Sequence, residues 1–318
     1  MSRKQLVISL GGGLGNQLFQ FAAANSYSDS HEILLETELL KPRKFYGKIS
    51  ELESLEFKKP LKIIKIRDRF NLKSQLSGYL ISRSAVTSST AITSRIKLFL
   101  VRCCFSVLLL VSTRRIFRVI VSDNLGYFER EIPNANCWLI GYFQSFRYLT
   151  DKTLSSIQES CPVEQSENYL VLQELAQSKG PTIIHLRLGD YLNERSFGLP
   201  SPDYYQESMK HLVSEGVTSE FWVFSDDLDL ARERLKDTQL QNIHFIETVG
   251  LSSAEVLKIM SLGVNFVIAN STFSYWAASL STNPNKIVVA PKVWFSQISE
   301  PRDLITKKWV RISSQESN

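Results

Sequence analysis

The strongest constraint on the fold is an alternation of short apolar segments with longer helical ones in the second half of the chain. The apolar segments have strand length and cover residues 182–186, 221–224, 244–246, 266–269 and 286–290. Helical periodicity covers residues 203–215, 227–236, 253–262 and 273–281. Strands that alternate with helices of this length are typical of βαβ units, so the pattern predicts a parallel sheet covered by helices.

The first half of the chain carries the same pattern less completely. Residues 5–10 form an apolar run that ends in three glycines, which indicates a buried strand, and a helix is expected over 15–25. Further strands are expected at 33–35 and 137–143, with helices at 146–157 and 169–176.

These two sets of elements predict a two-domain α/β protein in which both domains are doubly wound and Rossmann-like. We expect the first domain over residues 1–165 and the second over 166–318, with a ligand cleft at the carboxyl ends of the strands. The segment at about 58–130 is irregular and basic, and is expected to be a helical insert in the first domain.

Composition excludes several classes of protein. Hydrophobic residues at 43% and charged residues at 22% are globular values, which excludes a disordered chain. The four cysteines, Cys103, Cys104, Cys137 and Cys161, match neither a metal-ligand spacing nor a disulfide framework. Because the first residues also lack the pattern of a secretory signal, we expect a cytoplasmic protein.

Charge is distributed unevenly. Between Lys58 and Arg118 the chain has 14 basic residues and one acidic residue, Asp68. Such a segment can be a solvated face, a nucleic-acid site or a contact with an anionic membrane. No stacking motif accompanies it, so no nucleic-acid partner is expected. The apolar run from Leu98 to Val111 favours peripheral contact with an anionic membrane, and a helix buried on the first sheet is the alternative.

The first motif with possible chemistry is GGGLGNQLFQFA at residues 11–22. Glycines between a strand and a helix let backbone N–H groups approach an anionic ligand. A dinucleotide fingerprint is disfavoured because Asn16 stands where its last glycine should be, and no Gly-Lys-Ser/Thr follows for a P-loop. A glycine turn that only packs the strand on the helix is the alternative.

The second motif is HLRLGDY at residues 185–191, at the end of a predicted strand. The planar guanidinium of Arg187 suits phosphate oxygens. Asp190 could orient Arg187 or act as a base. The alternatives are a strand-end ion pair between Arg187 and Asp190 and a core role for His185.

The third motif is FSDDLD at residues 224–229. Asp227 and Asp229 resemble a DxD metal pattern, but we favour a cap of the following helix by Ser225 or Asp226, which is compatible with a nucleotide contact.

The fourth motif is IANSTFSYWAA at residues 268–278. Its Asn-Ser-Thr run precedes a helix and offers hydroxyls and N–H groups at a positive helix end, which suits a pyrophosphate.

Together these motifs resemble glycosyltransferase family 11, the α-1,2-fucosyltransferases. The resemblance also uses GYFQ at 141–144 and the segment from Pro291 to Trp294, and it leaves 60–130 unmatched. It implies a GT-B fold, with two Rossmann-like domains facing a cleft. It also implies inverting transfer of L-fucose from GDP-fucose to the 2-hydroxyl of a terminal galactose on a glycan. No cofactor and no metal are implied.

The resemblance also assigns roles to residues. Arg187 would bind the β-phosphate and act in catalysis with Asp190, the first candidate for the base; Glu194 and Glu36 follow. Donor-binding roles fall to Asn16, Gln17, His185, Ser225, Asp226, Glu255, Asn270, Ser271, Thr272 and Phe273. One departure is visible, because Leu188 stands where family members usually have a second arginine.

Bacterial enzymes of this kind build surface polysaccharide such as lipopolysaccharide O-antigen, so we expect a galactose-terminated and possibly lipid-linked acceptor at the inner face of the cell membrane. Two alternatives stay open. One is another GDP-sugar transferase with the same donor site, and the other is a non-catalytic protein that binds nucleotide or carbohydrate. A nicotinamide oxidoreductase is disfavoured by Asn16.

Overall fold

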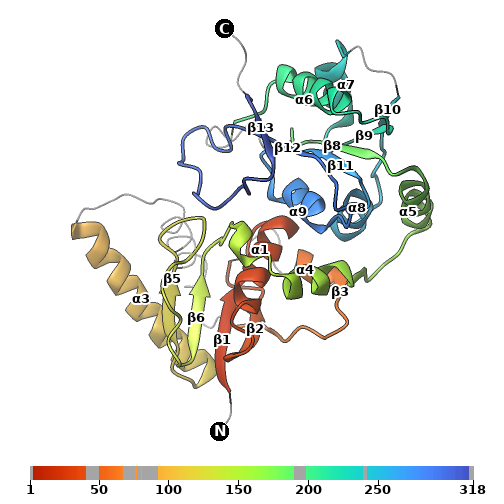
Figure 1. Cartoon of the computed structure of the whole chain (residues 1–318). Helices are drawn as coiled ribbons and strands as arrows, with labels where there is room; N and C mark the ends of the chain where they lie inside the picture. The colour runs from red at the N-terminus through yellow and green to blue at the C-terminus, as the bar shows by residue number, and fades with distance from the viewer. Residues whose placement is uncertain are drawn as a thin grey trace. The chain divides into compact units, whose positions relative to one another are not determined.

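The computed structural model describes residues 3–40, 50–66, 76, 80, 92–189, 198–238 and 242–314, with the side chains of 92–95 left out. The chain forms two compact units (Figure 1). The first comprises Met1–Ser160 and Pro301–Leu304, and the second comprises Cys161–Glu300 and Ile305–Asn318. The chain thus leaves the first unit shortly before the boundary expected at residue 165, and a short later segment returns to it.

The first unit is built on a parallel five-stranded sheet of order β4-β2-β1-β6-β5. Its strands are β1 (Lys4–Ser9), β2 (His31–Glu36), β4 (Ile63–Ile64), β5 (Arg118–Val121) and β6 (Cys137–Ile140). The strand order reverses between β1 and β6, so this sheet has a topological switch point there. The segment expected to be a helical insert therefore supplies both edge strands of the sheet, β4 and β5.

Helices and short elements surround this sheet. They are α1 (Leu14–Asn25), η2 (Glu51–Ser54), β3 (Leu55–Glu56), α3 (Ile92–Thr113), η3 (Phe146–Tyr148) and α4 (Asp151–Gln158). The single helix expected over 146–157 is two elements, because Ser145 caps η3 and Thr150 caps α4 separately. The strand expected to reach residue 143 ends at Ile140, and Phe143 has a left-handed φ of 56° that turns the chain.

One aromatic cluster fixes α3 on the first sheet. The ring of Trp138, in β6, meets Phe105 of α3 at 6.2 Å and Phe117 at 5.3 Å, both edge to face. Leu108 and Leu109 of the same helix are buried in this core. This burial agrees with the expectation of a helix covering the first sheet, but only for one face of α3.

The second unit contains a six-stranded parallel sheet of order β10-β9-β8-β11-β12-β13. Its strands are β8 (Thr182–Leu186), β9 (Phe221–Ser225), β10 (Ile243–Phe245), β11 (Asn265–Val267), β12 (Val288–Pro291) and β13 (Val310–Ile312). Counted along the unit, this order is 3-2-1-4-5-6, the order of the Rossmann fold. The prediction of an α/β chain with two Rossmann-like parallel-sheet units, the components of a GT-B fold, is confirmed.

The elements around the second sheet are β7 (Cys161–Pro162), α5 (Glu167–Lys179), α6 (Pro202–Ser214), α7 (Leu228–Leu235), α8 (Ser253–Ser261) and α9 (Thr272–Leu280). Every strand and helix predicted for residues 182–290 is present, with ends that differ by at most two residues. The sequence did not predict β13, because three half-buried residues give no periodicity.

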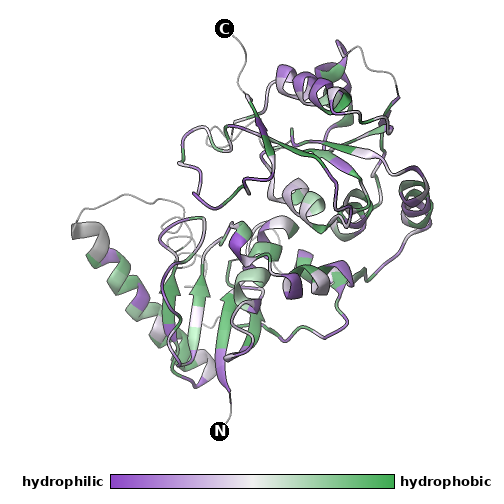
Figure 2. Ribbon diagram, viewed as in Figure 1, coloured by the Kyte–Doolittle hydropathy of each residue, from purple (hydrophilic) through white to green (hydrophobic). Residues whose placement is uncertain are grey.

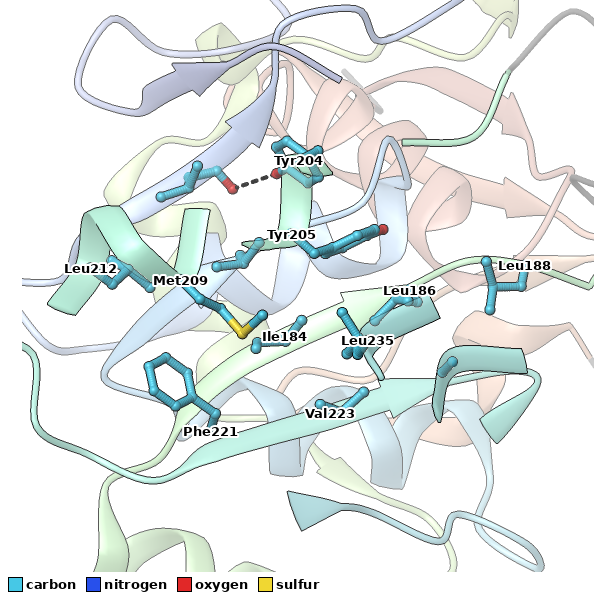
Figure 3. Packing of buried hydrophobic residues seen from close by; sticks show 13 residues of the cluster. Ile184, Leu186, Leu188, Tyr204, Tyr205, Met209, Leu212, Phe221, Val223 and Leu235 are labelled. Atoms are coloured by element: carbon cyan, nitrogen blue, oxygen red, sulfur yellow. Dashed lines mark hydrogen bonds between the residues drawn. The ribbon is translucent and has the colours of Figure 1, made fainter. Parts of the chain in front are cut away.

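The core of the second unit lies between α6 and the sheet (Figure 3). Tyr204 and Met209 of α6 pack over Ile184 of β8 and Val223 of β9. The buried Tyr204 hydroxyl donates to backbone carbonyls next to β11 and in β12, at 2.7 and 3.2 Å. A buried phenol therefore ties α6 to β12 and to the end of β11, which borders the point where the strand order reverses.

Candidate active site

The candidate site lies where the strand order of the second sheet reverses, between β8 and β11. In open α/β sheets, ligands bind outside the carboxyl ends of the strands at such a switch point. Residues 187–189 follow β8 directly, and residues 268–271 follow β11. Figure 3 shows Leu188 beyond Leu186 at the end of the β8 strand. The second and fourth motifs of the sequence therefore meet at one edge.

Arg187 is held at this edge by Asp226, which follows β9. Arg187 Nη1 lies 3.2 Å from Asp226 Oδ2, and the two side chains are 36% and 24% exposed. The same carboxylate accepts hydrogen bonds from the backbone N–H of Leu188 at 2.8 Å and of Gly189 at 3.1 Å. Asp226 thus fixes both the Arg187 side chain and the loop that carries it, while the guanidinium stays accessible to a ligand.

Gly189 is required for this contact. A Cβ at this position would lie 2.9 Å from Asp226 Oδ2, closer than real Cβ atoms come to other atoms. The sequence expected the partner of Arg187 to be Asp190, whereas the described partner is Asp226. Asp190 and Glu194, the first two candidates for the base, lie outside the described residues.

His185 is buried in β8 and is 6% exposed. Its ring centroid lies 6.0 Å from that of Phe273 in α9, so a ring contact links β8 to the first turn of α9. Burial, together with the charge of Arg187, lowers the pKa of His185 to about 4 against the partly compensating charge of Asp226. The imidazole is therefore neutral at pH 7.

One ring nitrogen of this neutral histidine is unsatisfied by protein. In the part of the chain that the structure describes, no group lies within hydrogen-bond distance of the buried His185 Nδ1. A buried polar atom without a partner costs about 1–3 kcal/mol, which a ligand atom would relieve. The sequence left open a core role for this histidine, and the unsatisfied nitrogen favours a role in ligand binding.

The positive end of α9 faces the same edge. Ser271 caps this helix, and its Oγ accepts from the Phe273 N–H at 3.3 Å. Thr272 and Phe273 are half-buried, and the first turn of α9 has no acidic residue. The positive end of the α9 dipole, with no carboxylate in its first turn to neutralise it, therefore suits an anion.

Asn270 joins two loops beside the site. Its side-chain Nδ2 donates to the backbone carbonyls of Gly198 and Trp294, each at 3.1 Å. Both amide hydrogens are thus used to join these loops. In this structure Asn270 shapes the backbone around the site, and its contact with the pyrophosphate stays a prediction.

The segment after β9 caps its helix one residue later than expected. Asp227 is the N-cap of α7 and accepts from the Leu230 N–H at 3.0 Å, while Ser225 Oγ accepts from the Asp227 N–H at 3.1 Å. Asp226, one of the two caps predicted, binds the Arg187 loop instead. Nowhere in the described ranges do three His, Cys, Asp or Glu side chains gather as metal ligands, so the DxD interpretation of Asp227 and Asp229 finds no partner.

Glu255 is also engaged within the second unit. Oε1 accepts from the N–H and hydroxyl of Ser166, both at 2.8 Å, and Oε2 accepts from the N–H and hydroxyl of Ser252. Burial alone would raise the pKa of Glu255, but these four bonds outweigh it and hold the pKa below its ordinary value. In this structure the carboxylate uses its four acceptor sites on the two serines, and its contact with guanine or ribose stays a prediction.

The glycine motif forms a second polar cluster, at the switch point of the first sheet. Gln17 donates to the Gly12 carbonyl at 2.8 Å and accepts from the Leu52 N–H at 2.8 Å. Both ends of this buried amide therefore bind protein in this structure, and a contact of Gln17 with the donor stays a prediction. Asn16 is half-buried, and its Oδ1 accepts from Gln144 at 3.0 Å.

Gln20 and Glu36 complete this cluster. Gln20 is 1% exposed and bridges the ends of β1 and β6, since it accepts from the Gly11 N–H and donates to the Gly141 carbonyl, both at 2.9 Å. The sequence missed this role, and its signal was a polar residue on the apolar face of a predicted helix. Glu36 is fully buried and accepts from the N–H groups of Glu38 and Leu39, which argues against its use as a base.

The comparison with known families decides the class of this protein. The model of glycosyl transferase family 11 matches residues 114–313. The chain belongs to glycosyl transferase family 11. The matched range includes β8, β9, β11 and α9, and so includes the switch point of the second sheet.

Two curated relatives come from Escherichia coli. An alpha-1,2-colitosyltransferase is 28% identical over 180 residues, which cover 54% of this chain and 61% of that protein, less than two thirds of its length. The O-antigen biosynthesis glycosyltransferase WbnK is 25% identical over 324 aligned positions, which cover 95% of this chain and 99% of that protein.

A solved structure with similar architecture is the fucosyltransferase NodZ from Bradyrhizobium. It has a TM-score of 0.48 and 10% identity, and the match covers 87% of this chain and 93% of that one. A TM-score under 0.5 supports no argument about function, so the fold assignment rests on the strand orders given above.

In this family 11 glycosyltransferase the predicted site residues that the structure describes fall into three groups. One group gathers at the switch point of the second sheet, and comprises His185, Arg187, Asp226, Ser271, Thr272 and Phe273. Asn16 and Gln17 lie in the first unit, and Ser225, Glu255 and Asn270 hold the second unit together.

Proposed function

We propose that this glycosyltransferase transfers L-fucose from GDP-fucose to the 2-hydroxyl of a terminal galactose on a glycan, with inversion and without a metal. The observation that carries the proposal is the placement of Arg187, fixed by Asp226 and partly exposed, at the switch point that also presents the N-terminus of α9. A fixed cation beside a positive helix end suits the diphosphate of a nucleotide sugar.

The proposed chemistry needs stabilisation of a leaving group. As the bond between the sugar and the β-phosphate breaks, negative charge grows on the departing GDP. A preorganised cation aimed at that charge lowers the barrier because it needs no reorganisation during the reaction. Arg187 would supply this charge and the positive end of the α9 dipole would add to it, so no divalent ion is required in the proposal.

His185 would act in donor binding. Because its pKa is about 4, the ring stays neutral and offers one donor and one acceptor at pH 7. The unsatisfied Nδ1 would gain its hydrogen bond from the guanine or from a phosphate oxygen of the donor.

The base that accepts the proton of the acceptor hydroxyl is proposed to be Asp190, with Glu194 as the alternative. Substitution separates them, because Asp190→Asn should abolish turnover while Glu194→Gln keeps it. The reverse result would move the role to Glu194, and near-normal turnover in both variants would exclude both residues.

The names of the relatives bear on donor and pathway. The alpha-1,2-colitosyltransferase supports an α-1,2 linkage and makes transfer of a related sugar from the same site the second candidate. The O-antigen name of WbnK supports a role in surface polysaccharide synthesis in the cytoplasm, on an acceptor that can be lipid-linked.

Calorimetric titration in EDTA tests the donor site without knowledge of the acceptor. GDP should bind, UDP and NAD should bind at least tenfold more weakly, and Arg302→Ala should serve as the unaffected arginine control. GDP-fucose should then fucosylate a galactoside at the 2-hydroxyl, as read by NMR of the product. GDP binding that requires a divalent ion would overturn the metal-independent mechanism, and no GDP binding in either condition would overturn the donor assignment.

A further inference from the structure

Helix α3 is apolar on two faces, and only one of them is covered by protein. Phe105, Leu108 and Leu109 are buried in the core of the first unit. The other face, which we term the α3 stripe, consists of residues that are 44–64% exposed: Ile96, Phe99, Leu100, Val107, Leu110 and Val111. Figure 2 shows the helix hydrophobic along most of its length.

The spacing of the α3 stripe makes it continuous. Its members follow the period of an α-helix, so they line one side of an element about 33 Å long at 1.5 Å per residue. A helix on the surface of a soluble unit normally carries polar residues on that side. An exposed apolar patch of this extent marks an interaction surface rather than scattered surface residues.

The charge around the α3 stripe has one sign. Residues 92–118 include six Lys or Arg and no Asp or Glu. Lys97 is exposed near the start of the stripe, and Arg114, Arg115 and Arg118 are exposed beyond its end. An apolar stripe flanked along the chain by cations matches the surface of a bilayer with anionic headgroups.

A basic pocket adjoins the end of α3. It has a volume of about 740 Å³, and its lining includes Lys65, Arg114 and Arg115 together with Val111 of the stripe. Arg114 ends the helix in a left-handed conformation, with φ 54°, and its N–H donates to the Leu110 carbonyl at 2.8 Å. The pocket therefore combines cationic groups for a phosphate with apolar contact for the chain attached to it.

Crossing the membrane is the competing arrangement. By length and composition alone, Ile96–Thr113 could span a bilayer. The helix is, however, packed on the first sheet through Phe105, Leu108 and Leu109, and Arg102 in its middle donates to the Val121 carbonyl at 3.4 Å. A spanning helix would have to give up these contacts, whereas a helix lying in the interface keeps them.

We propose that α3 docks this protein on an anionic lipid bilayer, with the stripe inserted among the headgroups and the flanking cations on lipid phosphates. A second copy of the chain is a poorer occupant, because pairing two such faces would bring their cations together. The proposal goes beyond the transfer reaction: it places the enzyme where a lipid-linked acceptor would be, and it holds whatever sugar is transferred.

Vesicle flotation of the purified full chain tests the proposal. Binding should be strong to phosphatidylcholine vesicles that contain phosphatidylglycerol, weak to pure phosphatidylcholine vesicles, and reduced at 1 M salt. Phe99→Gln/Val107→Gln should lower the partition coefficient about tenfold or more, since each change removes inserted apolar surface. Lys97→Gln/Arg114→Gln should lower it about thirtyfold, at roughly a factor of five per cation near the surface.

Matched variants keep the test interpretable. Leu170→Gln/Val171→Gln changes two comparably exposed apolar residues of α5, and Lys210→Gln/Lys308→Gln removes two exposed cations of the second unit; both should leave flotation unchanged. All four variants should keep the wild-type circular dichroism spectrum and GDP affinity, so a failure of docking is distinct from a failure of the donor site.

Three outcomes would overturn the docking proposal. The first is equal, negligible binding to neutral and anionic vesicles. The second is an oligomer in light scattering that the stripe variant converts to a monomer without any vesicle binding. The third is a membrane fraction that resists carbonate extraction, since this would indicate a spanning helix.

Discussion

The two parallel sheets use polar side chains differently at their switch points. In the first unit, Gln17 and Gln20 make all their hydrogen bonds to protein, and Gln20 joins the ends of β1 and β6. In the second unit, Arg187 stays partly exposed, and His185 Nδ1 has no hydrogen-bond partner among the residues that the structure describes. At the first switch point the polar side chains therefore bind other parts of the protein, whereas at the second switch point they are placed to bind a ligand.

The difference teaches where ligand chemistry should be sought. Neutral amides at the first switch point hold the backbone in place, whereas the second switch point presents a partly exposed cation, a buried neutral imidazole and a positive helix end, all of which suit an anionic ligand. Substitutions in the first cluster should therefore change stability, and substitutions in the second should change ligand affinity and turnover.

The largest expected effect is at the second switch point. Arg187→Ala should lower kcat by about 100–1000-fold, the range for loss of one preorganised donor to a transition-state charge. Steady-state kinetics with GDP-fucose measures it, and Arg302→Ala provides the matched arginine control. Retention of more than half the activity would show that Arg187 does not act in the mechanism. It would also remove the proposed functional difference between the two switch points.

The next prediction concerns how the free energy of unfolding depends on pH. It distinguishes the two switch points because His185 at the second can titrate, whereas the glutamine amides at the first cannot. The pKa of His185 is about 4 in the folded protein against an ordinary value of 6.5. Between these values the unfolded chain binds the extra proton, so the free energy of unfolding should fall by roughly 3 kcal/mol as pH drops from 6.5 to 4. Above pH 6.5 this group should make no difference.

Urea denaturation of wild type and His185→Gln at several pH values isolates this contribution. The variant should lose that part of the acid destabilisation, and His244→Gln, at an exposed histidine, should keep it. Parallel curves for wild type and His185→Gln would show that His185 titrates normally.

The third prediction concerns Gln20, which joins the ends of β1 and β6 at the first switch point. Gln20→Ala leaves the Gly11 N–H and the Gly141 carbonyl without their partner and should destabilise the protein by about 2–3 kcal/mol. Thermal unfolding measures the loss, with Gln206→Ala on the half-buried surface of α6 as the control. GDP affinity at a temperature where the variant is folded should stay within about twofold of wild type, and a large loss of GDP affinity would place ligand binding at the first edge as well.

The smallest expected effect is at Asp226, and it tests whether this residue positions Arg187 or only stabilises the fold. Asp226→Asn removes the charge that fixes Arg187 but keeps the shape of the side chain, so kcat should fall about tenfold, an increase in barrier of about 1.4 kcal/mol. The melting temperature should change little, because a partly exposed ion pair contributes little stability. Glu220→Gln, which breaks the exposed pair with Lys179, is the matched control. A loss of melting temperature with unchanged kcat would assign Asp226 a purely structural role.

The sequence predicted the second sheet well because its signal is local. Each strand and helix between residues 182 and 290 shows its own periodicity, and caps such as Ser252 lie beside the helices that they begin. The first half was predicted less completely. Its edge strands β4 and β5 lie in a segment with no clear pattern, and a strand of two residues such as β4 has no period to detect.

The sequence predicted which residue types lie at the site more reliably than it predicted the hydrogen-bond and ion-pair partners of those residues. Arg187 was found because an arginine at a strand end suits phosphate, but its partner Asp226 is 38 residues away rather than the nearby Asp190. The partners of Glu255 and Gln17 were missed for the same reason: their hydrogen bonds reach Ser166 and Leu52, and sequence spacing does not reveal such contacts.

The return of Pro301–Leu304 to the first unit has a consequence for synthesis. Within that unit, the Phe146 N–H donates to the Asp303 carbonyl at 2.9 Å, and Arg147 lies 3.4 Å from the Asp303 carboxylate. These contacts cannot form until the ribosome has added residue 303. The first unit therefore emerges early but is completed late, and a gene fragment ending at residue 160 would encode it without its last piece.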